Sequence, residues 1–350
     1  MPPFYDEPRH RVDEFQRVPG LALALKAAVD SDRTSGRFLL TGSVTMPAAQ
    51  PAGDSLAGRV VGTRVFGFSQ GERAGRRDDF VRAVLRGALE AQYRSGMGRA
   101  DYVDLLTAGS MPEACRLPQR YRADWLESYV SRLLGRDLRE FSRLSDPRRL
   151  RSLLAGLAAA QGSETVVARL GGAVNLSAST TTSYMELLRA LHLVERLPPW
   201  TPNLLKREVG RSKYLLTDSA LAMRLTRTSP DILKDLVRGG ALGGLLEAFV
   251  AAELMRQSTW CEERFTISHY RSPDGREIDL ILELDDGRVI AVEVKAASSA
   301  SAADARHLRW LEGRIGDRLV AGVVFTTDDR SRHLGGRLWA VPVAALWELG

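Results

Sequence analysis

The sequence is poor in cysteine and lysine, and it lacks any long apolar run. Its 350 residues include two cysteines, Cys115 and Cys261, which are too few and too far apart for a disulfide scaffold and suit a reducing compartment. No apolar stretch approaches the roughly 18 residues of a membrane-spanning helix. The N-terminus lacks the basic and apolar regions of a signal peptide. These absences predict a cytoplasmic protein without a membrane partner.

The basic side chains are almost all arginines. The 49 Lys and Arg residues exceed the 43 Asp and Glu residues by only six, which by itself is a weak sign of a polyanionic partner. Arginine suits bidentate phosphate contacts, although a GC-rich coding bias explains the same excess. The lysines are Lys26, Lys206, Lys213, Lys234 and Lys295. In such a chain Lys295, the last of them, invites a specific explanation.

Length and pattern predict an α/β protein of several domains. A chain of 350 residues with 44% hydrophobic and 26% charged residues is typical of two or three globular domains. Residues 1–145 mix strand-like pieces with long helices, and residues 146–227 read as helix, short helix, helix and hairpin. Residues 228–350 alternate strands with helices. We expect domain boundaries near residues 145 and 227.

The middle segment has the element order of a winged helix-turn-helix. Asp146 is expected to cap a helix that begins at Pro147. Two further helices follow, and the strands expected at 193–197 and 212–216 pair as a hairpin. The third helix is rich in Ser and Thr but poor in basic residues, and the basic residues Lys206, Arg207, Arg211 and Lys213 lie on the predicted wing instead. Winged helices bind DNA or other proteins, and the sequence leaves both open.

The clearest chemical signal lies in a predicted hairpin near the C-terminus. Asp279 lies on its first strand, and Glu293 and Lys295 lie on its second strand, two residues apart and therefore on one face. Asp-Asp-Gly at 285–287 is a strong turn signal between the strands. Carboxylates that converge beside a backbone carbonyl suit Mg²⁺, and the lysine could orient or deprotonate a water for phosphodiester hydrolysis. A further carboxylate, Glu247, lies in a mostly apolar helix, where it is costly unless bonded, exposed or bound to a metal.

This stretch resembles the PD-(D/E)xK nuclease superfamily over roughly residues 239–326. Asp279 and Glu293-Val294-Lys295 match its motif, and Glu247 stands where many members have a first-helix glutamate. The resemblance implies that Asp279, Glu293 and Glu247 hold Mg²⁺ and that Lys295 acts with Asp279 and Glu293 in catalysis. Two alternatives stay open: a fold of this type that binds without cutting, and an ordinary strand whose Glu293 and Lys295 face solvent.

The N-terminal segment resembles the core of AAA-type ATPases. Asp13 and Glu14 look like the end of a Walker B strand, and Thr41 or Ser43 would stand for the sensor on the next strand. The order of the whole chain resembles a prokaryotic AAA-type P-loop ATPase family with a C-terminal winged helix and a PD-(D/E)xK-like domain of unknown function. The resemblance implies a remnant nucleotide site at Asp13, Glu14 and Thr41.

The departure from that family concerns the phosphate-binding loop. No Gly-Lys pair exists in the chain, so the G-x-x-x-x-G-K-[ST] loop that cradles nucleotide phosphates is absent. We therefore expect a chain that begins partway through the ATPase core and does not bind ATP in the usual manner. The leading hypothesis is a truncated ATPase-family protein that acts on nucleic acid, with Mg²⁺-dependent cleavage by its last domain. One competing hypothesis is a non-catalytic module that binds DNA, another protein or a second copy of itself. The other is an ATPase whose P-loop is supplied by a missing segment or by a partner.

Overall fold

The computed structural model describes residues 10–18, 20–43, 56–137, 146–201, 210–236 and 239–349. The chain forms two compact units. The first contains residues 1–64 and 185–193, and the second contains residues 65–184 and 194–350. Helices and strands occur in both, which agrees with the expected α/β class.

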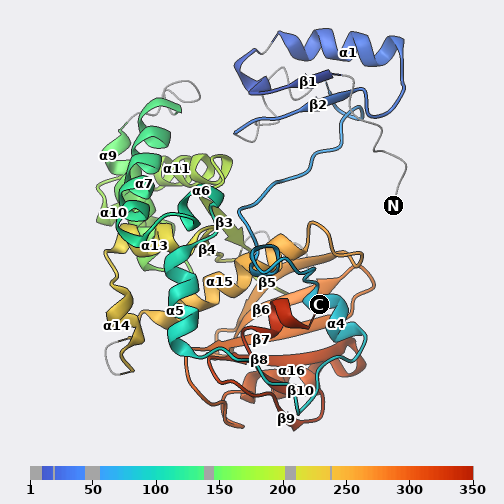
Figure 1. The fold of residues 1–350 in the computed structure, drawn as a ribbon, viewed down its shortest axis with the longest axis vertical. Helices are drawn as coiled ribbons and strands as arrows, with labels where there is room; N and C mark the ends of the chain where they lie inside the picture. Colours follow the sequence, from blue (N-terminus) through green and yellow to red (C-terminus); the bar gives the residue numbers. More distant parts are fainter. Residues whose placement is uncertain are drawn as a thin grey trace. The chain divides into compact units, whose positions relative to one another are not determined.

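The first unit is built on two short parallel strands. β1 (His10–Val12) pairs with β2 (Phe38–Leu40), and α1 (Leu21–Ser31) connects them after a 3₁₀ turn, η1 (Phe15–Arg17) (Figure 1). Ala22 and Leu25 of α1 pack with Phe15 and Leu56 in a small apolar core. The parallel pairing places the ends of both strands, and the polar residues that follow them, at the same edge.

The second unit contains a six-stranded mixed sheet in the order β5-β6-β7-β8-β10-β9. The strands are β5 (Phe265–Arg271), β6 (Glu277–Leu284), β7 (Val289–Lys295), β8 (Leu319–Thr326), β9 (Arg332–Gly335) and β10 (Leu338–Pro342). The expected hairpin joins β6 and β7, and Gly287 adopts the positive φ of 83° that its turn requires. β6 and β7 are buried along nearly their whole length, as expected for central strands.

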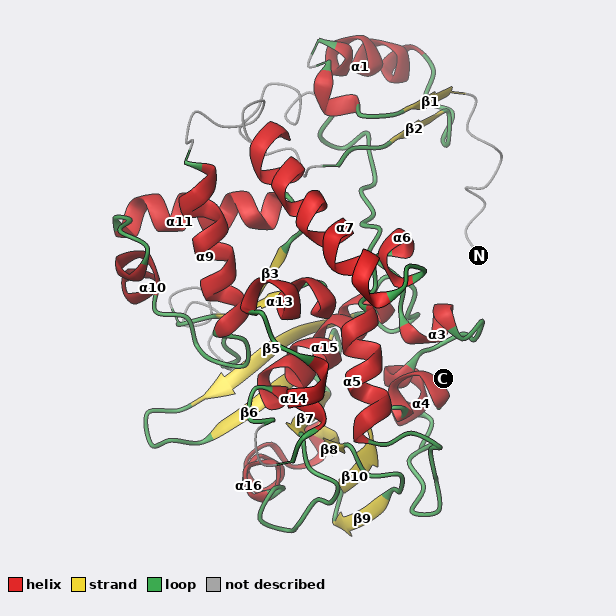
Figure 2. Ribbon diagram, turned by 60° about the vertical axis from the view of Figure 1, so that its left-hand side comes forward, coloured by secondary structure: helices red, strands yellow, loops and turns green. Residues whose placement is uncertain are grey.

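Helices accompany this sheet, some packed against it and others grouped to one side of it (Figure 1, Figure 2). They are α3 (Gln70–Arg73), α4 (Phe80–Leu85), α5 (Arg99–Ala108), α6 (Pro112–Cys115), α7 (Gln119–Arg132) with the π-helical turn η2 (Leu133–Asp137), α9 (Pro147–Ala159), α10 (Val167–Ala173), α11 (Ala178–Ala190, shared with the first unit), α13 (Ser219–Thr226), α14 (Pro230–Lys234), α15 (Leu242–Gln257), α16 (Arg306–Ile315), the 3₁₀ turn η3 (Gly316–Arg318) and α17 (Ala345–Glu348). α15 packs against β7, and α16 packs against β6, β7 and β8.

The segment 146–216 has the element order that the sequence predicts. α9, α10 and α11 are followed by β3 (Val194–Leu197) and β4 (Lys213–Leu216), which pair as antiparallel strands. Asp146 caps α9, because its carboxylate accepts hydrogen bonds from the backbone N–H groups of Arg148 and Arg149. The predicted wing residues Lys206 and Arg207 lie outside the described residues.

Residues 67–95, which belong to the first of the expected domains (1–145), pack against the C-terminal sheet and α15. The backbone N–H of Gln70 donates to Glu253 at 2.9 Å, and that of Phe80 donates to Gln257 at 2.9 Å. The ring of Phe80 lies 5.2 Å from that of Phe325 on β8. These contacts cover α15, which explains why most of this helix is buried and why its sequence is apolar on all sides.

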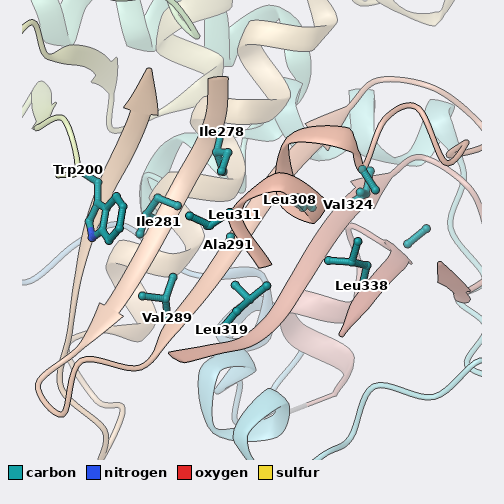
Figure 3. Close-up of a cluster of buried hydrophobic side chains, with 12 residues drawn as sticks. Trp200, Ile278, Ile281, Val289, Ala291, Leu308, Leu311, Leu319, Val324 and Leu338 are labelled. Carbon is teal, nitrogen blue, oxygen red and sulfur yellow. The ribbon is translucent and has the colours of Figure 1, made fainter. Parts of the chain in front are cut away.

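The loop after β3 anchors the hairpin to the sheet. Trp200 is 5% exposed and belongs to a core cluster with Ile278 and Ile281 of β6 (Figure 3). Its backbone N–H donates to the carbonyl of His269 on the edge strand β5, and the N–H of His269 donates to Pro198. These contacts fix β3 and β4 beside the edge of the sheet where β5 and β6 lie.

The helices of the described segments are all too short or too polar to cross a lipid bilayer.

Candidate functional site

The β6–β7 pair brings three predicted site residues together. Leu280 pairs with Val292, so Asp279 on β6 lies beside Glu293 on β7. The Val294 N–H donates to Asp279 Oδ2 at 2.8 Å, and Lys295 Nζ donates to Glu293 Oε2 at 2.7 Å. Asp279 is 8% and Glu293 4% exposed, whereas Lys295 is half-buried. The interpretation of these residues as a solvent-facing strand is therefore wrong, because β7 is a central strand of the sheet.

One carboxylate oxygen in this group is left without a partner. Glu293 Oε1 is buried and accepts no hydrogen bond from any described residue. Burial, together with the negative charge of Asp279, raises the pKa of Glu293, although Lys295 opposes this shift. For Lys295 the two neighbouring carboxylates outweigh burial and raise the pKa, so its amine is an ammonium at neutral pH. A buried, unpaired carboxylate oxygen of this kind attracts a proton or a cation.

A second lysine, on the β3–β4 hairpin, also lies in the site. Lys213, the first residue of β4, is 2% exposed, and its Nζ lies 2.8 Å from Glu247 Oε1 and 2.9 Å from Glu277 Oε1. Asp279 Oδ1 is 3.9 Å from the same nitrogen. Burial opposes the charge of Lys213, but these three carboxylates outweigh it and raise its pKa. Lys213 is therefore held as a buried ammonium between α15 and β6.

Glu247 forms an ion pair with this lysine. Burial and the charge of Asp279 raise its pKa, and Lys213 opposes the shift. Within the described segments, no three His, Cys, Asp or Glu side chains are arranged to hold one metal ion. Mg²⁺ needs only one or two protein carboxylates and keeps several waters, and Asp279 with the unpaired oxygen of Glu293 meets that requirement. Mg²⁺ ligation by Asp279, Glu293 and Glu247 stays a prediction.

The sequence reasoning missed Lys213 and Glu277 as members of this site. The sequence pattern assigns Lys213 to the predicted wing, whose partner it leaves open, and it assigns no role to Glu277. The scarcity of lysine drew attention to Lys295, and the same signal applies to Lys213, which precedes the apolar residues of a strand. No sequence pattern links Lys213 to Glu247 or Glu277, because they lie 34 and 64 residues apart in the sequence.

The structure also brings together the predicted nucleotide-site residues of the first unit. Asp13 and Glu14 follow β1, and Thr41 and Ser43 follow β2. The Thr41 hydroxyl donates to the Asp13 carboxylate, and the Ser43 hydroxyl donates to Glu14 Oε2 at 3.2 Å. The parallel register of Val12 with Leu40 causes this arrangement. Two acidic and two hydroxyl side chains thus share the carboxyl-terminal edge of the two strands, and nucleotide binding by Asp13, Glu14 and Thr41 stays a prediction.

Comparisons with known families agree with the N-terminal resemblance. Residues 5–74 match the model of an AAA domain. The chain carries an AAA-family domain. Residues 99–232 match a domain of unknown function, DUF8612, and residues 242–346 match another, DUF4143. The DUF4143 segment contains Glu247, Asp279, Glu293 and Lys295, and the DUF8612 segment contains Lys213.

Two curated mycobacterial proteins are similar to most of the chain. They are Uncharacterized protein Rv2008c of Mycobacterium tuberculosis and Uncharacterized protein Mb2031c of Mycobacterium bovis, and each is 27% identical over 290 residues. The aligned region covers 83% of this chain and 59% of each relative, so the chain spans somewhat more than half of their length.

Proposed function

We propose that this chain is an AAA-type ATPase-family protein that acts on nucleic acid through a PD-(D/E)xK-like domain at residues 228–350, next to a winged helix at 146–227. The observation that supports it best is the convergence of Asp279, Glu293 and Lys295 on neighbouring buried strands, with one oxygen of Glu293 unpaired. Such a group suits phosphodiester hydrolysis assisted by a hard cation. The reaction class is metal-assisted hydrolysis of a nucleic-acid backbone.

Each residue of the group has a distinct role in this proposal. Asp279 and Glu293 would hold Mg²⁺, which when bound supplies positive charge that polarises the phosphate. The backbone N–H of Val294 fixes the orientation of Asp279 through a 2.8 Å hydrogen bond. Lys295 carries its proton, so it would orient the attacking water and the phosphate as a donor and would not serve as the base. Its partial exposure, together with that of Glu277, marks the side from which a substrate strand can approach.

The test is cleavage of labelled single- and double-stranded DNA by the full chain with Mg²⁺ or Mn²⁺. We expect metal-dependent cleavage that falls by at least about 100-fold in Lys295→Ala and in Asp279→Asn. Asp286→Asn is the matched control, because Asp286 lies on the exposed turn of the same hairpin and pairs with Arg288, away from the carboxylate group. Absence of cleavage, or equal cleavage by wild type and Lys295→Ala, would contradict the hydrolytic proposal. DNA binding without cleavage would support a non-catalytic binding module.

A second candidate function is nucleotide binding by the first unit. The grouping of Asp13, Glu14, Thr41 and Ser43 at one strand edge favours it, because an Asp and a Glu next to a sensor hydroxyl are the AAA-type arrangement. The phosphate-binding loop would have to come from another segment or partner, since the sequence has none. We expect no binding of Mg²⁺-ATP by this chain alone in equilibrium dialysis. Saturable binding that is lost in Asp13→Asn would show that these residues suffice.

A further inference from the structure

A buried lysine among three carboxylates is an uncommon arrangement, because removing an ammonium from water is costly unless its partners compensate. Lys213 is 2% exposed, and it contacts Glu247 and Glu277 directly while Asp279 lies 3.9 Å away. It comes from β4, in a different family segment from the carboxylates that it contacts. We propose that Lys213 is a tethered cation that competes with a divalent metal ion for this acidic cluster. The inference rests on the function proposed above, since Asp279 belongs to both.

The charges of the cluster support competition. Four carboxylates, those of Glu247, Glu277, Asp279 and Glu293, lie on α15, β6 and β7. Among the described residues, three cations pair with them: Lys213, Lys295, and Arg271, whose Nη1 lies 3.4 Å from Glu277. With all four carboxylates ionised, the intact group is one positive charge short of neutrality. In that state the loss of Lys213 leaves it two positive charges short, which is the charge of one divalent ion.

The position of Lys213 is fixed by the fold, and this makes it an effective competitor. β4 pairs with β3, and the carbonyl of Arg211, two residues before Lys213, accepts a hydrogen bond from His269 Nε2 at 3.1 Å. On the other side of the hairpin, Trp200 is inserted into the core beside β6. A cation held in this way has a high effective concentration at the carboxylates. It orders Glu247 and Glu277 toward itself and leaves Glu293 Oε1 unpaired.

The test is Mn²⁺ binding to the full chain by isothermal titration calorimetry. In Lys213→Met we expect one Mn²⁺ to bind at least about tenfold more tightly than in wild type, because a buried positive charge about 3–4 Å from the carboxylates has been removed. Lys234→Met is the matched control, because Lys234 forms a 2.7 Å ion pair with Asp104 at the surface, and it should bind Mn²⁺ as wild type does. Equal Mn²⁺ affinity in wild type and Lys213→Met would overturn the proposal.

Thermal unfolding gives a second readout, because Lys213→Met leaves buried carboxylates without their cation. We expect a lowered Tm that Mn²⁺ raises more in Lys213→Met than in wild type. A variant that stays unfolded with and without Mn²⁺ would also overturn the proposal, since a divalent ion should replace the lost charge. Both readouts are independent of DNA cleavage. A failed cleavage assay would therefore reject hydrolysis alone, and unchanged Mn²⁺ binding would reject the competition alone.

Discussion

Replacing Arg256 by methionine is expected to lower the free energy of unfolding by about 3–5 kcal/mol, because it leaves a buried carboxylate without its cation. Glu253 is fully buried on α15, and Arg256 Nη1 lies 2.7 Å from its Oε1. The same guanidinium also donates to the carbonyls of Gly67 and Thr217. One side chain therefore joins α15 to two distant segments. Chemical denaturation monitored by circular dichroism measures the effect.

The control for this prediction is Arg189→Met. Arg189 and Glu186 have the same i, i+3 spacing and the same 2.7 Å separation, but their side chains are 35% and 56% exposed. Water and salt screen such a pair, so its loss should cost no more than about 0.5 kcal/mol. A similar loss of stability in the two variants would show that burial of Glu253 does not decide the effect.

The loss of unfolding free energy in Arg256→Met, called the deficit below, should also depend on pH. Burial raises the pKa of Glu253 above its ordinary 4.5, and Arg256 opposes this shift, so removing Arg256 raises the pKa further. A carboxyl with a raised native pKa keeps its proton in the folded state after the unfolded chain has lost it. Its contribution is therefore most favourable at low pH and is lost as pH rises above 4.5. We expect a smaller deficit at about pH 5 than at about pH 8, and a deficit that grows toward low pH would contradict this sign.

Trp200→Ala is expected to cost about 3–5 kcal/mol, because it leaves a cavity in the core and removes the anchor of the hairpin. Trp200 packs with Ile278 and Ile281, and its ring makes an edge-on contact with Tyr270 at 6.2 Å between centroids (Figure 3). The free energy of unfolding in urea measures the loss.

Trp125→Ala provides the comparison. Trp125 lies half-buried on α7 and stacks on Tyr129 with a centroid distance of 5.3 Å, so its removal leaves no enclosed cavity. We expect a loss of about 1 kcal/mol. Equal losses in both variants would mean that Trp200 is not an anchor of the fold.

The C-terminal elements could be predicted because their signals are local. The sequence predicts two hairpin strands on either side of the turn at 285–287, and β6 and β7 lie at those positions. The turn at 285–287 and the cap at Asp146 follow from residue types whose backbone preferences act over three or four positions. Asp279 lies close to Glu293 and Lys295 because their strands pair as a hairpin, and hairpin pairing is also a local interaction.

Tertiary structure alone decided the rest. The sequence could not show that residues 67–95 cover α15, because the hydrogen bonds of Gln70 and Phe80 to that helix span about 180 positions. Nor could it show that Lys213 occupies the acidic cluster, since that requires the hairpin to dock on β5. The residue type of a charged side chain does not show whether that side chain is exposed to solvent or buried in an ion pair. Only the packing of distant segments determines which carboxylates surround it, and therefore which charge the site still needs.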